Sequence, residues 1–113
     1  MVSIDGDGRL VTLVVMMHVD PALIDEKIEH VCALAHEHSK RPGFVSCSIH
    51  KSLDNSKIVE YIQWQTPEHL QAMRETFKAD SPQPPDFAKR IDWGIMNVVE
   101  VVEAAVTAKS EGL

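Results

Sequence analysis

The chain has 113 residues and a formal net charge of −6, which is the size of one domain with a single modest core. The acidic balance and the lack of any Lys/Arg run exclude an electrostatic footprint for nucleic acid. The apolar runs are too short to cross a membrane. The start, MVSIDGDGRL, lacks the features of a signal peptide, so we expect a cytoplasmic protein. We predict one domain over 1–113, with a loose lead-in at 1–9 and a frayed tail at 104–113.

The first predicted elements are a strand and a helix. The run at 10–19, LVTLVVMMHV, is almost continuously apolar and rich in β-branched residues, which indicates a central strand. Asp20 and Pro21 then supply the N-cap and the first-turn proline of a helix. Pro42-Gly43 ends that helix. Its apolar stripe consists of Ile24, Ile28, Val31, Cys32 and Ala35.

Residues 41–67 predict a hairpin around a two-residue turn at Asp54-Asn55. Ile49 then faces Glu60, and a four-residue loop would keep the same faces. The further pairs along the hairpin are Lys51 with Ile58, Cys47 with Ile62, and Val45 with Trp64. One face carries Val45, Cys47, Ile49, Ile58, Glu60, Ile62 and Trp64, and the other carries Phe44, Ser46, Ser48, His50, Val59, Tyr61 and Gln63.

A second helix and a last strand complete the pattern. Thr66-Pro67 predicts the helix start, and Leu70, Met73 and Phe77 form its apolar stripe. The prolines of ADSPQPP at 79–85 end the helix, and we interpret this loop as a variable connection in preference to a lid. We expect a further helical turn or two over 86–91, with Phe87 and Ile91 inward, and a strand over 95–102, IMNVVEVV.

The predicted order β-α-β-β-α-β is the α+β, ferredoxin-like split βαβ pattern, with an antiparallel sheet and both helices on one face. The hairpin face that carries Glu60 should then meet the helices. The opposite face has no helix to cover it, although Phe44, Val59 and Tyr61 lie there. We therefore predict a homodimer that pairs these uncovered faces by two-fold symmetry.

Glu60 is a single carboxylate on an apolar face. Burial would raise its pKa and make it a usable base near neutral pH. A base of this kind could deprotonate a phenol or hydroquinone, and the resulting anion can pass an electron to oxygen. The alternative is a structural Glu60 that pairs with Arg74, Arg90 or a lysine, or that lies where the strand leaves the core.

The remaining candidate residues would surround a ligand near Glu60. Trp64 could be an aromatic wall or an indole N–H donor, or a core residue at the strand end. His18 could shuttle protons, although a capping or surface role is the more common one. Ile62, Leu70, Met73 and Phe77 could form apolar pocket walls, and the helix residues among them fit a core stripe as well. The histidines show no metal-binding spacing, and we find no phosphate loop or nucleophile motif.

Three segments carry a family resemblance: PGFVS at 42–46, HKSLD at 50–54 and YIQWQ at 61–65. With VTLV at 11–14 and VDP at 19–21, they resemble the antibiotic biosynthesis monooxygenase domain family. The resemblance covers roughly residues 10–78. It implies a dimeric α+β barrel, and several members oxygenate aromatic polyketides or quinols with molecular oxygen and no metal or flavin.

The resemblance also shows where this chain departs from the family pattern. Trp64 matches a strand-end tryptophan, but Glu60 stands where the cofactor-free oxygenases have an asparagine. Haem-cleaving members carry an asparagine and a histidine where this chain has Val15 and, near the second place, Arg74. We therefore expect a cofactor-independent monooxygenase acting on a planar phenolic, quinol or polyketide-type molecule. The alternatives are a non-catalytic ligand-binding dimer, or an isomerase or cyclase using the same pocket.

Overall fold

The computed structural model describes residues 10–80 and 88–105, without the side chains of 77–80. In chain order the elements are β1 (Val11–His18), the short 3-10 helix η1 (Pro21–Leu23), α1 (Ile24–His38), β2 (Phe44–Lys51), β3 (Lys57–Trp64), α2 (Pro67–Asp80) and β4 (Arg90–Met96). The strands form one antiparallel sheet in the order β2-β3-β1-β4. This arrangement confirms the predicted α+β, split βαβ fold and the central position of the first strand.

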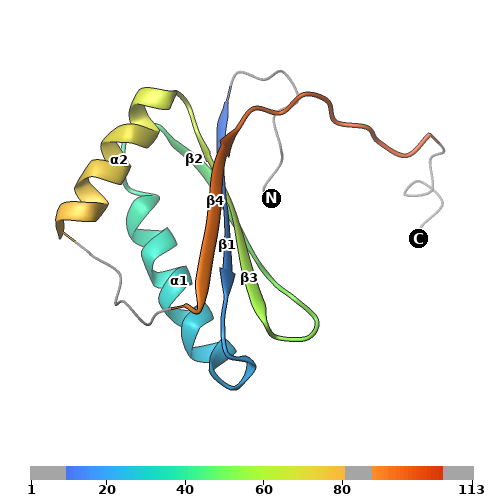
Figure 1. Cartoon of the computed structure of the whole chain (residues 1–113). Coiled ribbons are helices and arrows are strands. Elements are labelled where there is room, and N and C mark those ends of the chain that lie inside the picture. Colours follow the sequence, from blue (N-terminus) through green and yellow to red (C-terminus); the bar gives the residue numbers. More distant parts are fainter. Residues whose placement is uncertain (1–9, 81–87, 106–113) are drawn as a thin grey trace.

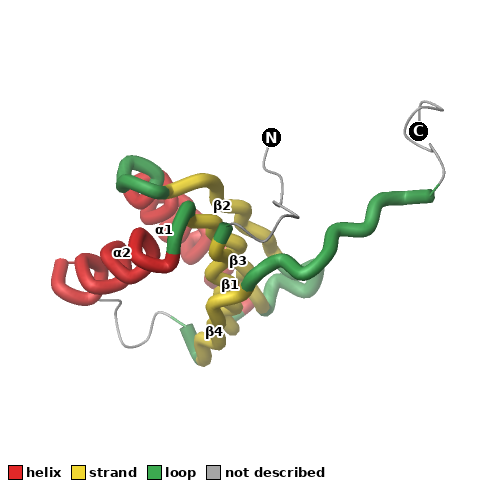
Figure 2. The backbone as a smooth tube through the Cα atoms, turned by 90° about the horizontal axis from the view of Figure 1, so that it is seen from above, coloured by secondary structure: helices red, strands yellow, loops and turns green. Residues whose placement is uncertain are grey.

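The sheet has one covered and one open face. Figure 1 shows α1 and α2 on the same side of the sheet. Figure 2, seen from above, shows the same layering, and residues 97–105 lead away on the side opposite the helices. Successive side chains along a strand point to opposite faces of the sheet. One set therefore faces the helices, and the other set lies on the open face.

Both helix starts follow the predicted capping chemistry. The backbone N–H of Ala22 donates to Oδ1 of Asp20 at 3.0 Å, and the first turn is a 3-10 turn. The backbone N–H of His69 donates to Oγ1 of Thr66 at 3.1 Å. Each cap satisfies a donor that the first helical turn leaves unpaired.

The hairpin has the predicted register over most of its length. Ile49 pairs with Glu60, and the pairs on either side also match the prediction. The loop, however, has four residues instead of two, because the N–H of Ser52 bonds the carbonyl of Lys57 at 3.0 Å. Asn55 supplies the left-handed backbone of this loop, with φ of 62°. The strand residues keep their predicted faces of the sheet, because loops of two and of four residues give the same parity.

A β-bulge at Val45 corrects one predicted pair. Phe44, not Val45, lies opposite Trp64, since the register shifts between Phe44 and Ser46. Phe44 therefore turns to the helix side and packs edge-to-face on Trp64, with ring centroids 5.5 Å apart. Val45 is left exposed. The extra residue of a bulge reverses the alternation, so these two apolar residues exchange faces.

The last strand lies earlier in the chain than predicted. β4 covers Arg90–Met96 and pairs with β1, whereas residues 97–102 belong to no strand. Arg90 and Ile91 are in the strand and not in a helical turn; residues 81–87, with the proline-rich loop and Phe87, lie outside the described part. Tertiary pairing has overridden the β propensity of the valine run, because Ile91, Trp93 and Ile95 line up with the apolar face of β1.

The core between sheet and helices has two parts. One is centred on Trp64 and the other on Ile58, and both of these side chains are fully buried. The first cluster contains Val11, Leu13, Ile62, Trp64, Leu70 and Met73, and the second contains Met17, Val19, Ile24, Val31 and Ile58. The burial of Ile24 against Val19 agrees with the predicted hydrophobic contact at the start of α1.

Replacing Gly43 by Ala should lower the free energy of unfolding by about 2 kcal/mol. Gly43 has φ of +84°, and a Cβ there would collide with the ring of His69. Gly94→Ala is the matched control, because its Cβ would meet only the mobile end of Met96 at 3.2 Å. Urea unfolding of both variants measures the difference. Equal stability of the two variants would contradict the tight contact between Gly43 and α2.

Candidate functional site

A pocket of about 470 Å³ opens between the sheet and the helices. Its wall is mainly apolar, and Glu60, His38 and Arg74 are its ionisable members. The lining residues come from every regular element but β2 and η1: Leu13, Val15 and Met17 of β1, Val31, Leu34 and His38 of α1, Glu60 and Ile62 of β3, Met73 and Arg74 of α2, and Ile91 and Trp93 of β4. A pocket with apolar walls and few polar groups is the usual form of a small-molecule site.

Glu60 points into this pocket, as the hairpin parity predicts. Its neighbours across the strands are Ile49 and Val15. Burial raises the pKa of Glu60 from 4.5 to about 7, and a hydrogen bond from Cys47 opposes the rise. The thiol donates to Oε2 over 3.8 Å, a long and weak bond. Near neutral pH the carboxyl group therefore exchanges readily between its two protonation states.

The structure does not pair Glu60 with a cation within the described residues. Arg90 binds Oδ1 of Asp92 at 3.0 Å, and its position on β4 belongs to the other face of the sheet. Arg74 lies over Trp93 instead. The ion-pair alternative for Glu60 is therefore not observed in the part of the chain that the structure describes. A buried carboxylate without a counter-ion is costly, and such groups concentrate at functional sites.

Cys47 contacts Glu60 and stays protonated. Burial first, and then the charge of Glu60 and the hydrogen bond to it, raise the pKa of the thiol to about 12. A thiol with this pKa is a poor nucleophile. Cys47 therefore serves Glu60 as a weak hydrogen-bond donor and keeps its proton at neutral pH.

His38 joins the site from α1, which sequence analysis did not anticipate. Burial and the nearby charge of Arg41 lower its pKa, and Glu37 partly opposes this. His38 is therefore neutral at pH 7 and can donate or accept a hydrogen bond. The signal was present in the spacing of Val31, Leu34 and His38, which lie on one side of a helix at i, i+3 and i+7.

The other predicted site residues divide into two groups. Ile62 and Met73 line the pocket beside Glu60. Trp64 and Leu70 are buried in the neighbouring core and do not line it, so their location matches the core interpretation. The indole N–H of Trp64 has no hydrogen-bond partner among the described residues. The side chain of Phe77 lies outside the described part.

His18 lies away from the pocket. It alternates with Met17 on β1, so its side chain belongs to the open face, where Nε2 is 3.3 Å from Oδ2 of Asp92. The structure therefore separates His18 from Glu60 by the thickness of the sheet. A strand-end histidine can occupy either face, and only the parity of β1 against β3 decides which.

Arg74 and Trp93 form the second feature that sequence analysis missed. The guanidinium carbon lies over the indole, 4.5 Å from the ring centroid, which is the geometry of a cation–π contact. Trp93 is 55% exposed, so the Arg74–Trp93 pair lies where the pocket meets solvent, on the helix side of the sheet. The alternation of Ile91, Trp93 and Ile95 is the signal for Trp93, and it was obscured by the misplaced last strand.

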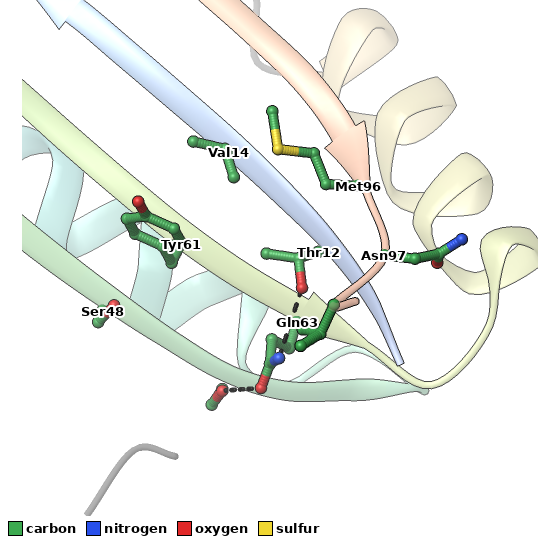
Figure 3. Close-up of a pocket in the computed structure, with 9 residues that line it drawn as sticks. Thr12, Val14, Ser48, Tyr61, Gln63, Met96 and Asn97 are labelled. Atoms are coloured by element: carbon green, nitrogen blue, oxygen red, sulfur yellow. Dashed lines mark hydrogen bonds between the residues drawn. The ribbon is translucent and has the colours of Figure 1, made fainter. Parts of the chain in front are cut away.

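The open face carries a smaller hollow of about 160 Å³. Figure 3 shows Gln63 at its floor, with Tyr61 and Ser48 along the strands and Met96 and Asn97 at its edge. The Gln63 amide donates to Thr12 at 3.4 Å and accepts from the Ser46 hydroxyl at 3.4 Å. This hollow is on the opposite side of the sheet from Glu60, so it is not part of the same site.

No helix in the part of the chain that the structure describes is long and apolar enough to span a membrane. Within the same residues, no three His, Cys, Asp or Glu side chains come together as metal ligands.

Comparison with known proteins agrees with this fold. No family model matches the chain. The chain is 32% identical over 88 residues to tetracenomycin-F1 monooxygenase of Streptomyces glaucescens, covering 77% of this chain and 75% of that protein. The sequence of this α+β domain, which has an apolar pocket between its sheet and helices, is thus similar to that of a monooxygenase. The chain belongs to the antibiotic biosynthesis monooxygenase family, and oxygenation is the general kind of activity among these relatives.

Solved structures share the fold at low sequence identity. A monooxygenase from the gene ActVA-Orf6 of Streptomyces coelicolor, in complex with nanaomycin D, has a TM-score of 0.63 at 20% identity, with 89% of this chain and 96% of that chain covered. The heme-degrader MhuD of Mycobacterium tuberculosis has a TM-score of 0.66 at 18% identity, with 82% and 99% covered. Proteins with different activities therefore use this fold, and the activity must be argued from the site.

Proposed function

We propose that the protein is a cofactor-independent monooxygenase that acts on a planar phenolic, quinol or polyketide-type molecule, with Glu60 as the general base. One observation carries the proposal: a carboxyl group with a pKa of about 7 faces an apolar pocket without a counter-ion among the described residues. An acid of this pKa is half ionised at pH 7, where it can both take up and release a proton efficiently. Family membership supports oxygenation as the reaction type.

The proposed reaction begins with proton transfer from the substrate to Glu60. For an anthrone-type substrate, the proton leaves the ring CH₂ carbon, and the resulting anion gives one electron to O₂. The substrate radical and superoxide then combine through a new C–O bond, and Glu60 returns its proton to the peroxide anion to give a hydroperoxide. Loss of the second ring hydrogen with cleavage of the O–O bond leaves a carbonyl and one water. The substrate supplies four electrons, and O₂ accepts all of them.

The apolar walls have a defined part in this scheme. Ile62, Val15 and Met73 are the apolar walls beside Glu60, and these walls disfavour the charged form of the acid, which maintains its raised pKa. They also offer flat apolar surface to a fused ring system. O₂ is itself apolar and needs no charged binding group. The protein would thus supply a base, an apolar cavity and orientation, while the substrate anion carries out the redox chemistry.

Oxygen uptake with anthrone tests the proposal. The expected result is consumption above autoxidation, with one O₂ used per anthraquinone formed and no accumulation of hydrogen peroxide. Uptake no faster than in buffer, for anthrone and for menadiol, would contradict the proposal. A rise in melting temperature with these ligands and no turnover would favour the non-catalytic binding alternative. Conversion without oxygen consumption would favour an isomerase or cyclase.

We also propose that the protein is a homodimer through the open face of the sheet. Tyr61 is 39% exposed there and packs edge-to-face on His50. Residues 97–105 leave the same side with Val99 and Val102 almost fully exposed. Apolar surface of this kind is expected to be covered in a stable soluble protein, most simply by a second copy.

Light scattering should give a mass of twice the chain's 12.6 kDa at micromolar concentration. Tyr61→Asp should shift the protein to monomer, because a carboxylate would be buried without a partner at the interface. Leu53→Asp is the matched control, since Leu53 is fully exposed at the hairpin loop on the edge of the domain. A monomeric wild type, or equal dimerisation of both variants, would refute the proposed interface.

A further inference from the structure

Glu60 and Trp93 lie in one row that crosses the sheet. Ile49 pairs with Glu60, Glu60 with Val15, and Val15 with Trp93. All of these side chains therefore share the helix-facing side of the sheet. Two strand spacings separate Glu60 from Trp93, or about 10 Å between their backbones. A fused polycyclic ring system of that width can span the row, with one end at the acid and the other at the indole.

Arg74 places a positive charge at the Trp93 end of this row. Its guanidinium carbon lies 4.5 Å from the indole centroid, and both residues line the pocket. Among the residues that the structure describes, no carboxylate forms an ion pair with Arg74; Asp92 binds Arg90 and Glu37 binds Lys40. An arginine has five N–H donors and no acceptor. Among the described residues, this mainly apolar pocket thus holds one cation, Arg74, that no carboxylate neutralises.

We propose that Arg74 and Trp93 form a subsite for an anionic substituent, a carboxylate, on a planar aromatic substrate. The inference rests on the proposed function, since it places the reacting carbon near Glu60 and the charged group at the opposite end. Trp93 stacks on the outer ring, and Arg74 binds the carboxylate with two N–H groups. The planar guanidinium matches a carboxylate in this bidentate way.

The charges in the pocket favour a carboxylate over a phosphate. Glu60 becomes negative as it ionises near pH 7, and Arg74 supplies one positive charge. A single carboxylate leaves the subsite neutral. A phosphate dianion would leave an uncompensated negative charge in an apolar pocket that must already accommodate an ionised base.

Binding of 2-naphthoate and 2-naphthamide, measured by calorimetry, tests the subsite without any turnover. The two probes have the same ring system and differ in the charge of the substituent. Wild type should bind the carboxylate roughly 10-fold more tightly, because a charge-assisted bond is stronger than a neutral one. The preference should shrink between about 0.02 and about 0.5 M KCl, since the site is partly open to solvent.

Arg74→Gln should abolish the preference, and Arg74→Lys should retain only part of it. Arg90→Gln is the matched control, because it removes the same charge from the open face of the sheet. Equal affinities in wild type, no measurable binding of either probe, or a preference that survives Arg74→Gln would each overturn the subsite. An arginine that merely covers Trp93 predicts a lower melting temperature in Arg74→Gln with an unchanged affinity ratio.

Oxygen uptake separates this inference from the proposed function. Uptake with anthrone together with equal binding of the two naphthyl probes would refute the subsite and leave the oxygenase intact. A carboxylate preference that depends on Arg74, without oxygen uptake on any quinol or anthrone, would support the subsite and refute the oxygenase.

Discussion

Replacing Glu60 by Gln should lower the rate of oxygen uptake with anthrone roughly 100-fold or more, which is the usual contribution of a general base. The amide has nearly the same shape as the acid and cannot accept the substrate proton. Because burial raises the pKa of Glu60 to about 7, uptake by the wild type should fall as the pH drops below 7. The variant should lose this pH dependence together with the activity.

Glu75→Gln is the matched control for that measurement. Glu75 is an exposed residue of α2 whose carboxylate accepts a hydrogen bond from Gln71. It undergoes the same chemical change one residue away from Arg74, but outside the pocket. Its oxygen uptake should equal that of the wild type. If Glu60→Gln and Glu75→Gln retain equal rates, Glu60 is not the base.

The same Glu60→Gln variant should become more stable than the wild type as the pH rises. The folded protein holds the Glu60 proton up to a pKa of about 7, above the ordinary 4.5. The unfolded chain therefore loses this proton first, and the wild type loses stability between pH 4.5 and 7. Removing the ionisable group should cancel this loss, about 3 kcal/mol at pH 8 relative to pH 4.

Urea unfolding at pH 4 and pH 8 measures this effect. Comparing the variant with the wild type at both pH values cancels the pH-independent cost of burying the amide. Glu75→Gln is the control here as well, because it makes the same substitution at an exposed position outside the pocket. A stability difference between Glu60→Gln and wild type that stays constant with pH would contradict the buried, neutral acid.

Local signals in the sequence were sufficient for the caps, the helices and most of the hairpin. Asp20 and Thr66 are caps whose chemistry acts within a few residues. The pairing of Ile49 with Glu60 follows from the parity of the two strands, which the loop length preserves. These features depend on the order of neighbouring residues, so no knowledge of the tertiary fold is needed.

The bulge and the last strand were not predictable in the same way. Phe44 and Val45 are both apolar, so the sequence gives no preference for which one turns inward. The valine run after Met96 has higher β propensity than a strand containing Asp92 and Gly94. Pairing with β1 decides the position of β4, and that partner is remote in the sequence.

The candidate site shows the same division between local and remote information. The inward position of Glu60 is a property of the hairpin alone. The contact between Arg74 and Trp93 joins a helix to an edge strand, and His38 approaches from another helix. For Trp64 the local motif was misleading. Its place in the motif suggested a pocket wall, but the bulge at Val45 lets Phe44 pack over Trp64 in the core.

Strand β3 serves both faces of the sheet, because Glu60 and Ile62 line the pocket on the helix side, while Tyr61 and Gln63 belong to the open face. An insertion of a single amino acid in this strand would exchange the two sets at once. Substitutions along β3 can therefore change the pocket or the open face separately, one residue at a time. Changes in the length of the hairpin loop leave both sets on their faces when residues are added or removed in pairs.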